Sequence, residues 1–479
     1  MEVEVCLVNG SGCFVHLPAT AKVRELKAAA QEQLRRRFLS LTSAGRRLDL
    51  ESGCPGRVEA ILQCPQLAAT ATAFALHIQG GSAVTWGDPS CGGQSGHVRE
   101  QLAHIQGIQS TFCSPLSGAF AAIRDDGTVV TWGTPRFGGN CCQVQEQLTH
   151  VRQIQATGTA FAAIRDDGTV VTWGHLHNGG DSSAVQDQLT QVRQIQASDN
   201  AFAAIRNDGS VVAWGNGAFG GDLSIRIQEQ LTRVRQIQAS SQAFAAIRED
   251  GSVVAWGSED MGGDTRPVRS ELVHVQQIQA TDFAFAAIRE DGSVVTWGLS
   301  NCGGDSEDVQ EQLIHVEKIQ ATNSAFAAMR SDGVVVTWGG RSGGGESSRV
   351  QEQLTHVRAI QSSDFAFAAL RDDGSVVTWG MPECGGDSCQ VQEQLTHVQQ
   401  IQATAGAFAA IRADGQVIAW GCPKRGGAVP QSVQEQLARV SQIQASMNAF
   451  AAIRDDGLVL TWGDLPGDFG EMQELVDLL

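Results

Sequence analysis

Tyrosine is absent from the 479 residues, and lysine occurs only four times, so the positive charge is almost entirely arginine. Acidic residues outnumber basic ones, 52 against 34, and the formal net charge is −18. Nucleic-acid phosphates are bound by basic stripes, so this balance argues against a nucleic-acid-binding protein. No stretch approaches the roughly 18 consecutive apolar residues of a membrane-spanning helix. We therefore expect neither nucleic acid nor membrane as a partner.

The sequence also has no C-x-x-C pair, and its 12 cysteines are scattered. The first residues carry Glu2 and Glu4 where a secretory signal would carry positive charge. We therefore expect an intracellular protein with reduced thiols rather than a disulfide framework. The composition leaves open whether it is cytoplasmic or nuclear.

What the sequence does contain is one repeating unit. The ten tryptophans are separated by 46, 41, 41, 42, 41, 41, 41, 41 and 42 residues, so each occupies the same place in a unit of about 41 residues. Periods of this size are typical of solenoids, propellers or arrays. These tryptophans are Trp86, Trp132, Trp173, Trp214, Trp256, Trp297, Trp338, Trp379, Trp420 and Trp462.

The unit at 144–173 illustrates the predicted elements. Residues 160–165 (AFAAIR) and 169–173 (TVVTW) are rich in β-branched, aromatic and alanine residues, and Asp167-Gly168 between them predicts a tight hairpin with positive φ at both turn residues. Both faces of these strands are apolar, so each strand must be covered on both sides. The many alanines indicate that neighbouring sheets approach closely.

The segments before and after the hairpin are also assigned to elements. Residues 144–148 (VQEQL) fit a short helical turn or an edge strand, and 151–156 (VRQIQA) fit a strand. The loop after each Trp-Gly is polar and variable, usually contains Gly-Gly, and is expected to be exposed. The first hairpin lacks a QEQL segment upstream, while MQEL at 472–475 supplies one. This favours a closed ring over an open superhelix, which remains the alternative.

Units of this form, with V-x-x-I-x-A, a D-G hairpin, V-x-x-W-G and G-G, resemble regulator-of-chromosome-condensation-type repeats over residues 65–479. The resemblance implies a mainly β, propeller-like array, here with ten units where the family usually has seven. It also implies guanine-nucleotide exchange on a small GTPase as an alternative function. Large ubiquitin ligases combine similar propellers with a catalytic domain, so substrate recognition for a ligase is a further alternative.

Residues 1–64 form a separate predicted domain without tryptophan. Two strands around Asn9-Gly10, a helix over 21–34, a strand–turn–strand over 38–50 and a strand over 58–63 follow one another. This order resembles the ubiquitin-like β-grasp fold, with 44–48 similar to its central turn. The resemblance implies partners from the ubiquitin pathway.

Three repeated polar positions are candidates for chemistry, and each has a structural explanation. The histidine after QEQL interchanges with Gln191, Arg233 and Arg439, as expected of a solvated surface position. Asp-Gly is explained by turn formation, and the Gly-Gly-Asp loops carry one acid per 41 residues or so, too sparse for calcium. We therefore predict no catalytic, metal or cofactor site, and we expect the tryptophans to be core residues.

These observations predict a non-enzymatic protein-interaction scaffold, with a link to the ubiquitin system through residues 1–64. The binding surface is expected in the variable loops after each Trp-Gly, for example 134–143 and 175–184.

Overall fold

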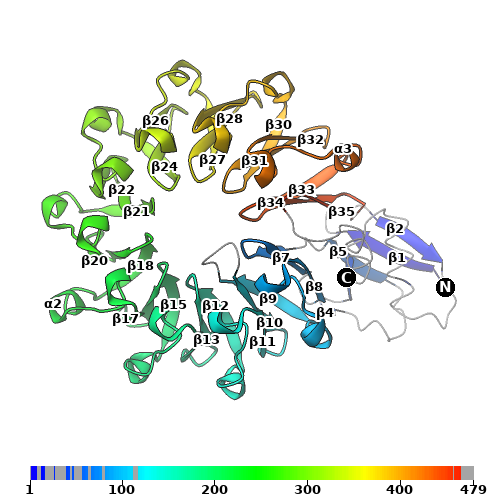
Figure 1. The fold of residues 1–479 in the computed structure, drawn as a ribbon, viewed down its shortest axis with the longest axis horizontal. Coiled ribbons are helices and arrows are strands. Elements are labelled where there is room, and N and C mark those ends of the chain that lie inside the picture. Colours follow the sequence, from blue (N-terminus) through cyan, green and yellow to red (C-terminus); the bar gives the residue numbers. More distant parts are fainter. Residues whose placement is uncertain are drawn as a thin grey trace.

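The computed structural model describes residues 2–7, 12–16, 26, 39–43, 46–47, 57–62, 66–77, 81–111, 117–456 and 458–464. Within these residues the fold is mainly β, with ten three-stranded antiparallel sheets and one five-stranded sheet. Each three-stranded sheet is built from one sequence unit, and the sheets curve around a central space (Figure 1). The ten units predicted from the tryptophan spacing are therefore ten separate sheets.

The first strand of each sheet corresponds to the predicted VRQIQA strand, and first strands of successive sheets contact one another around the central space (Figure 1). These strands are β6 (Gln66–Ala69), β9 (Ile105–Ser110), β12 (Val151–Ala156), β15 (Val192–Ala197), β18 (Val234–Ala239), β21 (Val275–Ala280), β24 (Val316–Ala321), β27 (Val357–Ser362), β30 (Val398–Ala403) and β33 (Val440–Ala445).

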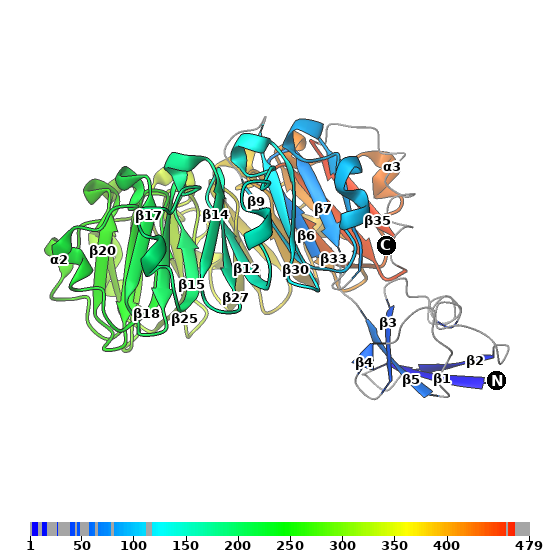
Figure 2. The same ribbon diagram turned by 90° about the horizontal axis from the view of Figure 1, so that it is seen from below.

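The second and third strands form the predicted hairpins. The second strands are β7 (Ala73–His77), β10 (Ala119–Arg124), β13 (Ala160–Arg165), β16 (Ala201–Arg206), β19 (Ala243–Arg248), β22 (Ala284–Arg289), β25 (Ala325–Arg330), β28 (Ala366–Arg371), β31 (Ala407–Arg412) and β34 (Ala449–Arg454). The third strands are β8 (Ala83–Gly87), β11 (Val129–Gly133), β14 (Val170–Gly174), β17 (Val211–Gly215), β20 (Val253–Gly257), β23 (Val294–Gly298), β26 (Val335–Gly339), β29 (Val376–Gly380), β32 (Val417–Gly421) and β35 (Val459–Gly463). Figure 2 shows these strands running side by side through the thickness of the array.

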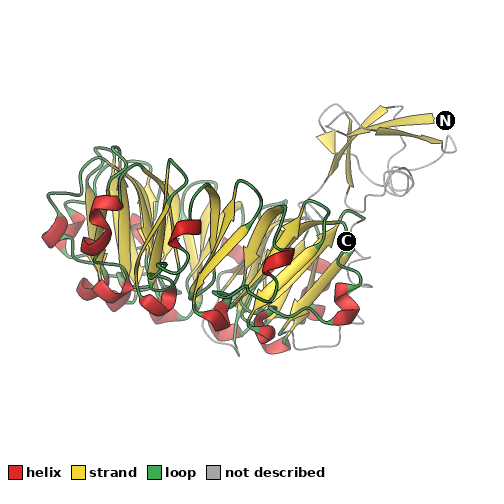
Figure 3. Ribbon diagram, turned by 90° about the horizontal axis from the view of Figure 1, so that it is seen from above, coloured by secondary structure: helices red, strands yellow, loops and turns green. Residues whose placement is uncertain are grey.

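Short helices of three to six residues lie around the periphery of the sheets (Figure 3). One set follows the third strands: η1 (Pro89–Cys91), η3 (Pro135–Phe137), η5 (Leu176–Asn178), η7 (Gly217–Phe219), η8 (Glu259–Met261), η10 (Ser300–Cys302), η12 (Arg341–Gly343), η14 (Pro382–Cys384) and η16 (Pro423–Arg425). The other set lies at or directly before the QEQL-like segments: η2 (Gly96–Gln101), η4 (Gln145–Gln147), η6 (Gln186–Gln188), α2 (Ile225–Gln228), η9 (Arg266–Val268), η11 (Glu307–Gln312), η13 (Gln351–Gln353), η15 (Gln392–Gln394) and α3 (Gln431–Gln434). Of the two predictions for QEQL, the helical turn is confirmed.

The hairpin turn differs from the predicted one. Only its glycine has positive φ, +78° at Gly168, and the Gly168 N–H donates to the Arg165 carbonyl over 2.9 Å. The predicted positive φ at Asp167 is therefore wrong. Its carboxylate instead accepts hydrogen bonds from the backbone and hydroxyl of Thr169, at 2.9 and 2.6 Å, which holds an ordinary turn closed by a glycine bulge.

The core lies between neighbouring sheets. Phe161 and Ala163 face the preceding sheet, where they meet Ala119 and Ala121, whereas Ala160 and Ala162 face the following sheet. A large side chain from one sheet thus fills the space left by small side chains on the next. Each tryptophan stacks on the phenylalanine opposite it in the hairpin, as Phe161 and Trp173 do at a centroid distance of 5.2 Å. The predicted burial of all ten tryptophans is confirmed, with at most 9% exposure.

The first and last sheets contact each other. Phe74, Leu76 and Trp86 of the first unit share a buried cluster with Ala449 and Ile453 of the last. Such a contact between units far apart in the sequence is a feature that repetition alone cannot specify. The MQEL segment at 472–475 lies outside the described residues.

The strands described within 1–64 form the five-stranded sheet. These are β1 (Glu2–Leu7), β2 (Gly12–His16), β3 (Leu39–Ser43), β4 (Arg46–Arg47) and β5 (Arg57–Leu62), in the order β2-β1-β5-β3-β4, with β1 and β5 parallel. The predicted helix over 21–34 lies outside the described residues except for Leu26, which is helical. The ubiquitin-like assignment of this domain, and the boundary at residue 64, stay predictions.

Candidate functional site

The variable loops and the turns between first and second strands lie at the same end of the sheets. The register pairs Ala160 with Gly174 and Ala156 with Phe161, which places the start of each loop beside the turn at 157–159. The Thr157 hydroxyl donates to the Asn178 carbonyl of the loop over 3.2 Å. This end of the array, which we call the loop face, therefore carries an inner series of turns and an outer series of loops.

The base of each loop is fixed by contacts with the next unit. Gly138 has φ +98°, and a Cβ on it would lie 2.5 Å from the Phe161 ring. The Trp173 indole N–H donates to the Gly138 carbonyl over 3.0 Å. The Gly-Gly pairs, predicted to lie in irregular exposed loops, are instead part of the inter-unit packing, because only glycine allows this close approach.

The tip of each loop is both exposed and variable, as predicted. The tip is the single-turn helix between Trp-Gly and Gly-Gly, and its first two residues are exposed in all nine described loops. Those pairs are Pro89-Ser90, Pro135-Arg136, Leu176-His177, Gly217-Ala218, Glu259-Asp260, Ser300-Asn301, Arg341-Ser342, Pro382-Glu383 and Pro423-Lys424. A constant frame therefore presents a different pair of side chains at each unit.

Neighbouring loops enclose grooves. The groove between the loops after β11 and β14 has a volume of about 1180 Å³ and is lined by Arg136, His175 and His177 among others. A second groove, of about 960 Å³, lies between the loops after β26 and β29 and contains Arg341 and Glu346. The edges of the stacked tryptophans form part of both linings. Such grooves between adaptable polar loops are suited to binding a segment of another protein.

The inner turns are joined by backbone hydrogen bonds from unit to unit. Gly158 N–H donates to the Asp199 carbonyl over 2.8 Å, and the pattern continues around the array. The later members of the series run through Ser241, Asp282, Asn323, Asp364, Ala405 and Met447. The space between these inner turns has a volume of about 700 Å³.

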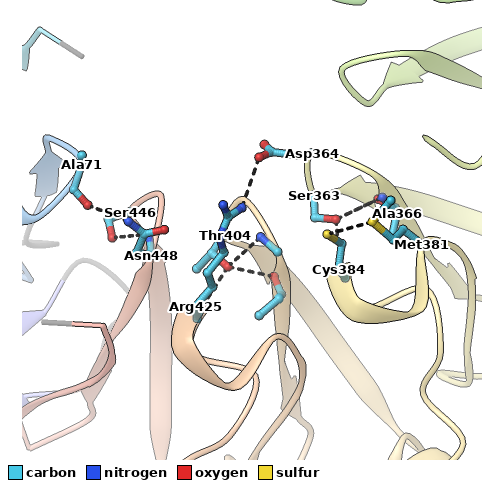
Figure 4. Close-up of polar contacts among 12 residues, drawn as sticks. Ala71, Ser363, Asp364, Ala366, Met381, Cys384, Thr404, Arg425, Ser446 and Asn448 are labelled. Atoms are coloured by element: carbon cyan, nitrogen blue, oxygen red, sulfur yellow. Dashed lines mark hydrogen bonds and ion pairs between the residues drawn. The ribbon is translucent and has the colours of Figure 1, made fainter. Parts of the chain in front are cut away.

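Three carboxylates lie on the inner turns. Burial raises the pKa values of Asp199, Asp282 and Asp364, and the neighbouring carboxylates Asp199 and Asp364 add to the effect on Asp282, whose pKa reaches about 6. Arg425 forms an ion pair of 3.3 Å with Asp364 (Figure 4). At the junction of the last and first units, the Asn448 side-chain amide donates to the Ala71 carbonyl over 3.1 Å (Figure 4).

The repeated histidine is exposed, as predicted, but it also has a backbone role that the sequence analysis missed. His150 has φ +54°, and its carbonyl accepts from Asp166 N–H over 2.8 Å while the next residue, Val151, donates to Gly127 of the preceding unit over 2.9 Å. The same positive φ occurs at His104, Gln191, Arg233, His274, His315, His356, His397 and Arg439. The enrichment of histidine in this conformation was the available signal.

The Gly-Gly-Asp acids cap their own loops. The Asp181 carboxylate accepts from Ser183 N–H over 2.9 Å, and Asp264 pairs with Arg266 at 2.8 Å. Within the described residues no three His, Cys, Asp or Glu side chains come together as a metal-binding group. Within the described side chains, Cys141, Cys142, Cys302, Cys384, Cys389 and Cys422 are free thiols. No helix of that same part of the chain is long and apolar enough to cross a membrane.

Comparison with known proteins gives structural likenesses only. No family model and no curated protein matches the chain. Among solved structures, Prp20p from Saccharomyces cerevisiae, studied for its binding to Gsp1p and histones, is 14% identical, with 87% of this chain and 88% of that one covered and a TM-score of 0.35. Yeast RCC1 (Prp20) bound to Kap60 gives 15% identity, coverages of 96% and 85%, and a TM-score of 0.34. The ectodomain of the Physcomitrella patens receptor kinase CR4 is 14% identical, with 58% of this chain and 74% of that one covered and a TM-score of 0.36. All three TM-scores lie below 0.5, so the proposals below rest on the geometry of this chain.

Proposed function

We propose that this protein is a non-catalytic, intracellular protein-interaction scaffold whose binding surface is the loop face. One observation carries the proposal. In every described loop the base is held by the same buried glycine contact, whereas the two exposed tip residues differ from unit to unit. A rigid frame that displays changing side chains is suited to selective recognition, because little conformational freedom is lost on binding.

We also propose that the ten units close into a ring. The buried cluster shared by Phe74 and Ala449, together with the hydrogen bond from Asn448 to Ala71, supports this arrangement. Closure would remove the exposed ends that an open repeat array must cap. It would also hold all loop tips in a constant arrangement around the loop face.

A link to the ubiquitin system is proposed for the N-terminal domain. The support is the resemblance of residues 1–64 to the β-grasp fold and the mixed sheet in which β1 pairs in parallel with β5. In this proposal the loop face captures one protein while the N-terminal domain contacts a component of the ubiquitin pathway, so that the chain acts as an adaptor.

Loop replacement tests the scaffold proposal. In a triple variant of the full chain, the tips 135–137, 176–178 and 217–219 each take the sequence of the tip at 300–302, while all Gly-Gly pairs stay. Affinity capture from a lysate followed by mass spectrometry should lose partners of the wild type, with circular dichroism and melting temperature unchanged. Capture of the same partners by a folded triple variant would contradict the proposal.

A nucleotide-release assay with purified small GTPases tests the alternative that the family resemblance implies. The scaffold proposal expects no acceleration by the full-length protein. Acceleration that the triple loop variant abolishes would replace the scaffold proposal with an exchange activity on the same face.

A further inference from the structure

The groove between the second and third units brings one arginine and two histidines together in an otherwise acidic protein. Arg136 in η3 lies against His175, with its Nη2 3.1 Å from the imidazole Nε2, and the His175 and His177 rings lie 6.1 Å apart. All three side chains line the groove of about 1180 Å³. Three nitrogen-bearing groups thus converge from two neighbouring loops.

Arg136 differs from other loop arginines in what surrounds it. Arg341 is paired with Glu346 at 3.2 Å, and Arg266 is paired with Asp264 at 2.8 Å. In the described part of the chain, Arg136 forms no ion pair with a carboxylate and contacts an imidazole instead. Its charge is therefore available to an anionic group from outside.

His175 adds an independent observation. A guanidinium can only donate, so the hydrogen bond from Arg136 leaves the His175 proton on Nδ1. That Nδ1 atom is buried and has no hydrogen-bond partner among the described residues. Burial, followed by the charges of Arg136 and His177, lowers the pKa of His175. A carboxylate beside Arg136 and His177 in the groove would offset this repulsion.

The remaining titratable groups that line the groove include one carboxylate. They are Asp181, Cys141 and Cys142. The Asp181 carboxylate is engaged by the backbone of Ser183 at 2.9 Å, and Cys141 donates to the Gln145 side chain over 3.0 Å. Beside the groove, Leu176 is 63% exposed, one of the few large apolar side chains exposed in the described structure.

We infer that this groove binds an acidic peptide segment of a partner protein, with a carboxylate against Arg136 and the imidazoles and an aliphatic side chain against Leu176. The inference rests on the proposed scaffold function and names the chemistry of one partner. A peptide fits better than a nucleic acid because only the peptide offers an aliphatic side chain to Leu176.

Fluorescence anisotropy on the full-length protein tests this inference. The probe is a labelled peptide of Leu and Glu residues, compared with the same peptide carrying Gln for Glu and with a single-stranded oligothymidine of equal length. We expect the Glu peptide alone to bind. Arg136→Ala should weaken binding about tenfold, as the loss of one charged hydrogen bond does. Leu176→Ser should weaken it several-fold.

Arg99→Ala is the matched control, because it removes the same charge from an exposed position on η2, outside the groove. It should leave peptide binding unchanged. The inference is overturned if the wild type does not bind the Glu peptide, if Arg136→Ala binds as tightly as wild type, if Arg99→Ala weakens binding equally, or if the oligothymidine binds in an Arg136-dependent way. Loss of partners in the triple loop variant without any binding of the Glu peptide would overturn this inference alone. Retention of partners there would overturn the scaffold proposal alone.

Discussion

The indole nitrogen of Trp173 donates a hydrogen bond of 3.0 Å to the carbonyl oxygen of Gly138, which belongs to the preceding unit. Equivalent bonds join eight further tryptophans to the glycine of the unit before them. Because each unit completes its polar contacts through its neighbour, the units depend on one another for stability, as in other repeat arrays.

Truncation of a central tryptophan tests the core. Trp214→Ala removes a side chain that is 3% exposed, its stacking on Phe202, and its hydrogen bond to Gly179. We expect a loss of about 3–5 kcal/mol in the free energy of unfolding, as for other large-to-small core changes. Urea denaturation measures it. Trp214→Phe, which keeps part of the packing, should cost less, and an equal cost would contradict the packing explanation.

The glycine at the base of a loop tests the close approach between units. Gly138→Ala places a Cβ 2.5 Å from Phe161 at a φ of +98°. The substitution should therefore lower the melting temperature. We expect a cost of more than about 1 kcal/mol. Gly96→Ala is the control, because its Cβ would meet nothing within 4 Å. Equal melting temperatures for the two variants would refute the contact.

Replacement of Asp282 tests the effect of the three carboxylates on the inner turns. Its folded-state pKa of about 6 lies above its ordinary value of 3.8. The folded protein is therefore more stable when Asp282 is protonated, and this stability is lost as the pH rises through about 6. After allowance for solvent screening, Asp282→Asn should stabilise the protein by about 1–2 kcal/mol at pH 8 and hardly at all at pH 4. Denaturation across this pH range measures the difference.

Asp291, in the hairpin of the same unit, has a lowered pKa where Asp282 has a raised one. Hydrogen bonds from the side chain and backbone of Ser293 lower its pKa, so its contribution is present above the unfolded-state pKa and is lost as the pH falls through the folded-state value. Asp291→Asn should therefore destabilise at neutral pH and less in acid. A shared pH trend for the Asp282 and Asp291 variants would contradict the assignment of both shifts.

The positive-φ histidine is tested by two substitutions at one position. His150→Gly should be neutral or slightly stabilising, because glycine adopts a φ of +54° without strain. His150→Val should cost about 1–2 kcal/mol, since a β-branched residue is strained there. Thermal denaturation compares the two. If valine is tolerated as well as glycine, the backbone role of this position is wrong.

The junction of the last and first units is tested through Asn448. Asn448→Ala removes the hydrogen bond to Ala71, so amide hydrogen exchange in β7 and β34 should become faster. Asn200→Ala is the control, because it alters the same position of an internal unit whose turn is joined to the next by a backbone hydrogen bond. It should leave hydrogen exchange in β7 unchanged. Unaltered exchange in Asn448→Ala would argue against a closing role.

The sequence by itself determined the elements of each unit. The tryptophan period predicted ten units, and the alternation of Phe161 and Ala163 with Ala160 and Ala162 predicted strands covered on both faces, because side-chain period and burial are local consequences of composition. The turn was predicted at the right place with the wrong φ at Asp167, since Asp-Gly is compatible with more than one turn geometry.

Only the tertiary structure decided how units meet. The Gly138 contact, the positive φ of His150 and the convergence of Arg136 with His175 each join residues of successive units, and no pattern within one unit specifies such a pair. The raised pKa of Asp282 likewise depends on burial and, after it, on carboxylates two units away on either side. Local propensity acts within a strand or turn, whereas burial, charge proximity and groove shape depend on which surfaces the packed sheets bring together.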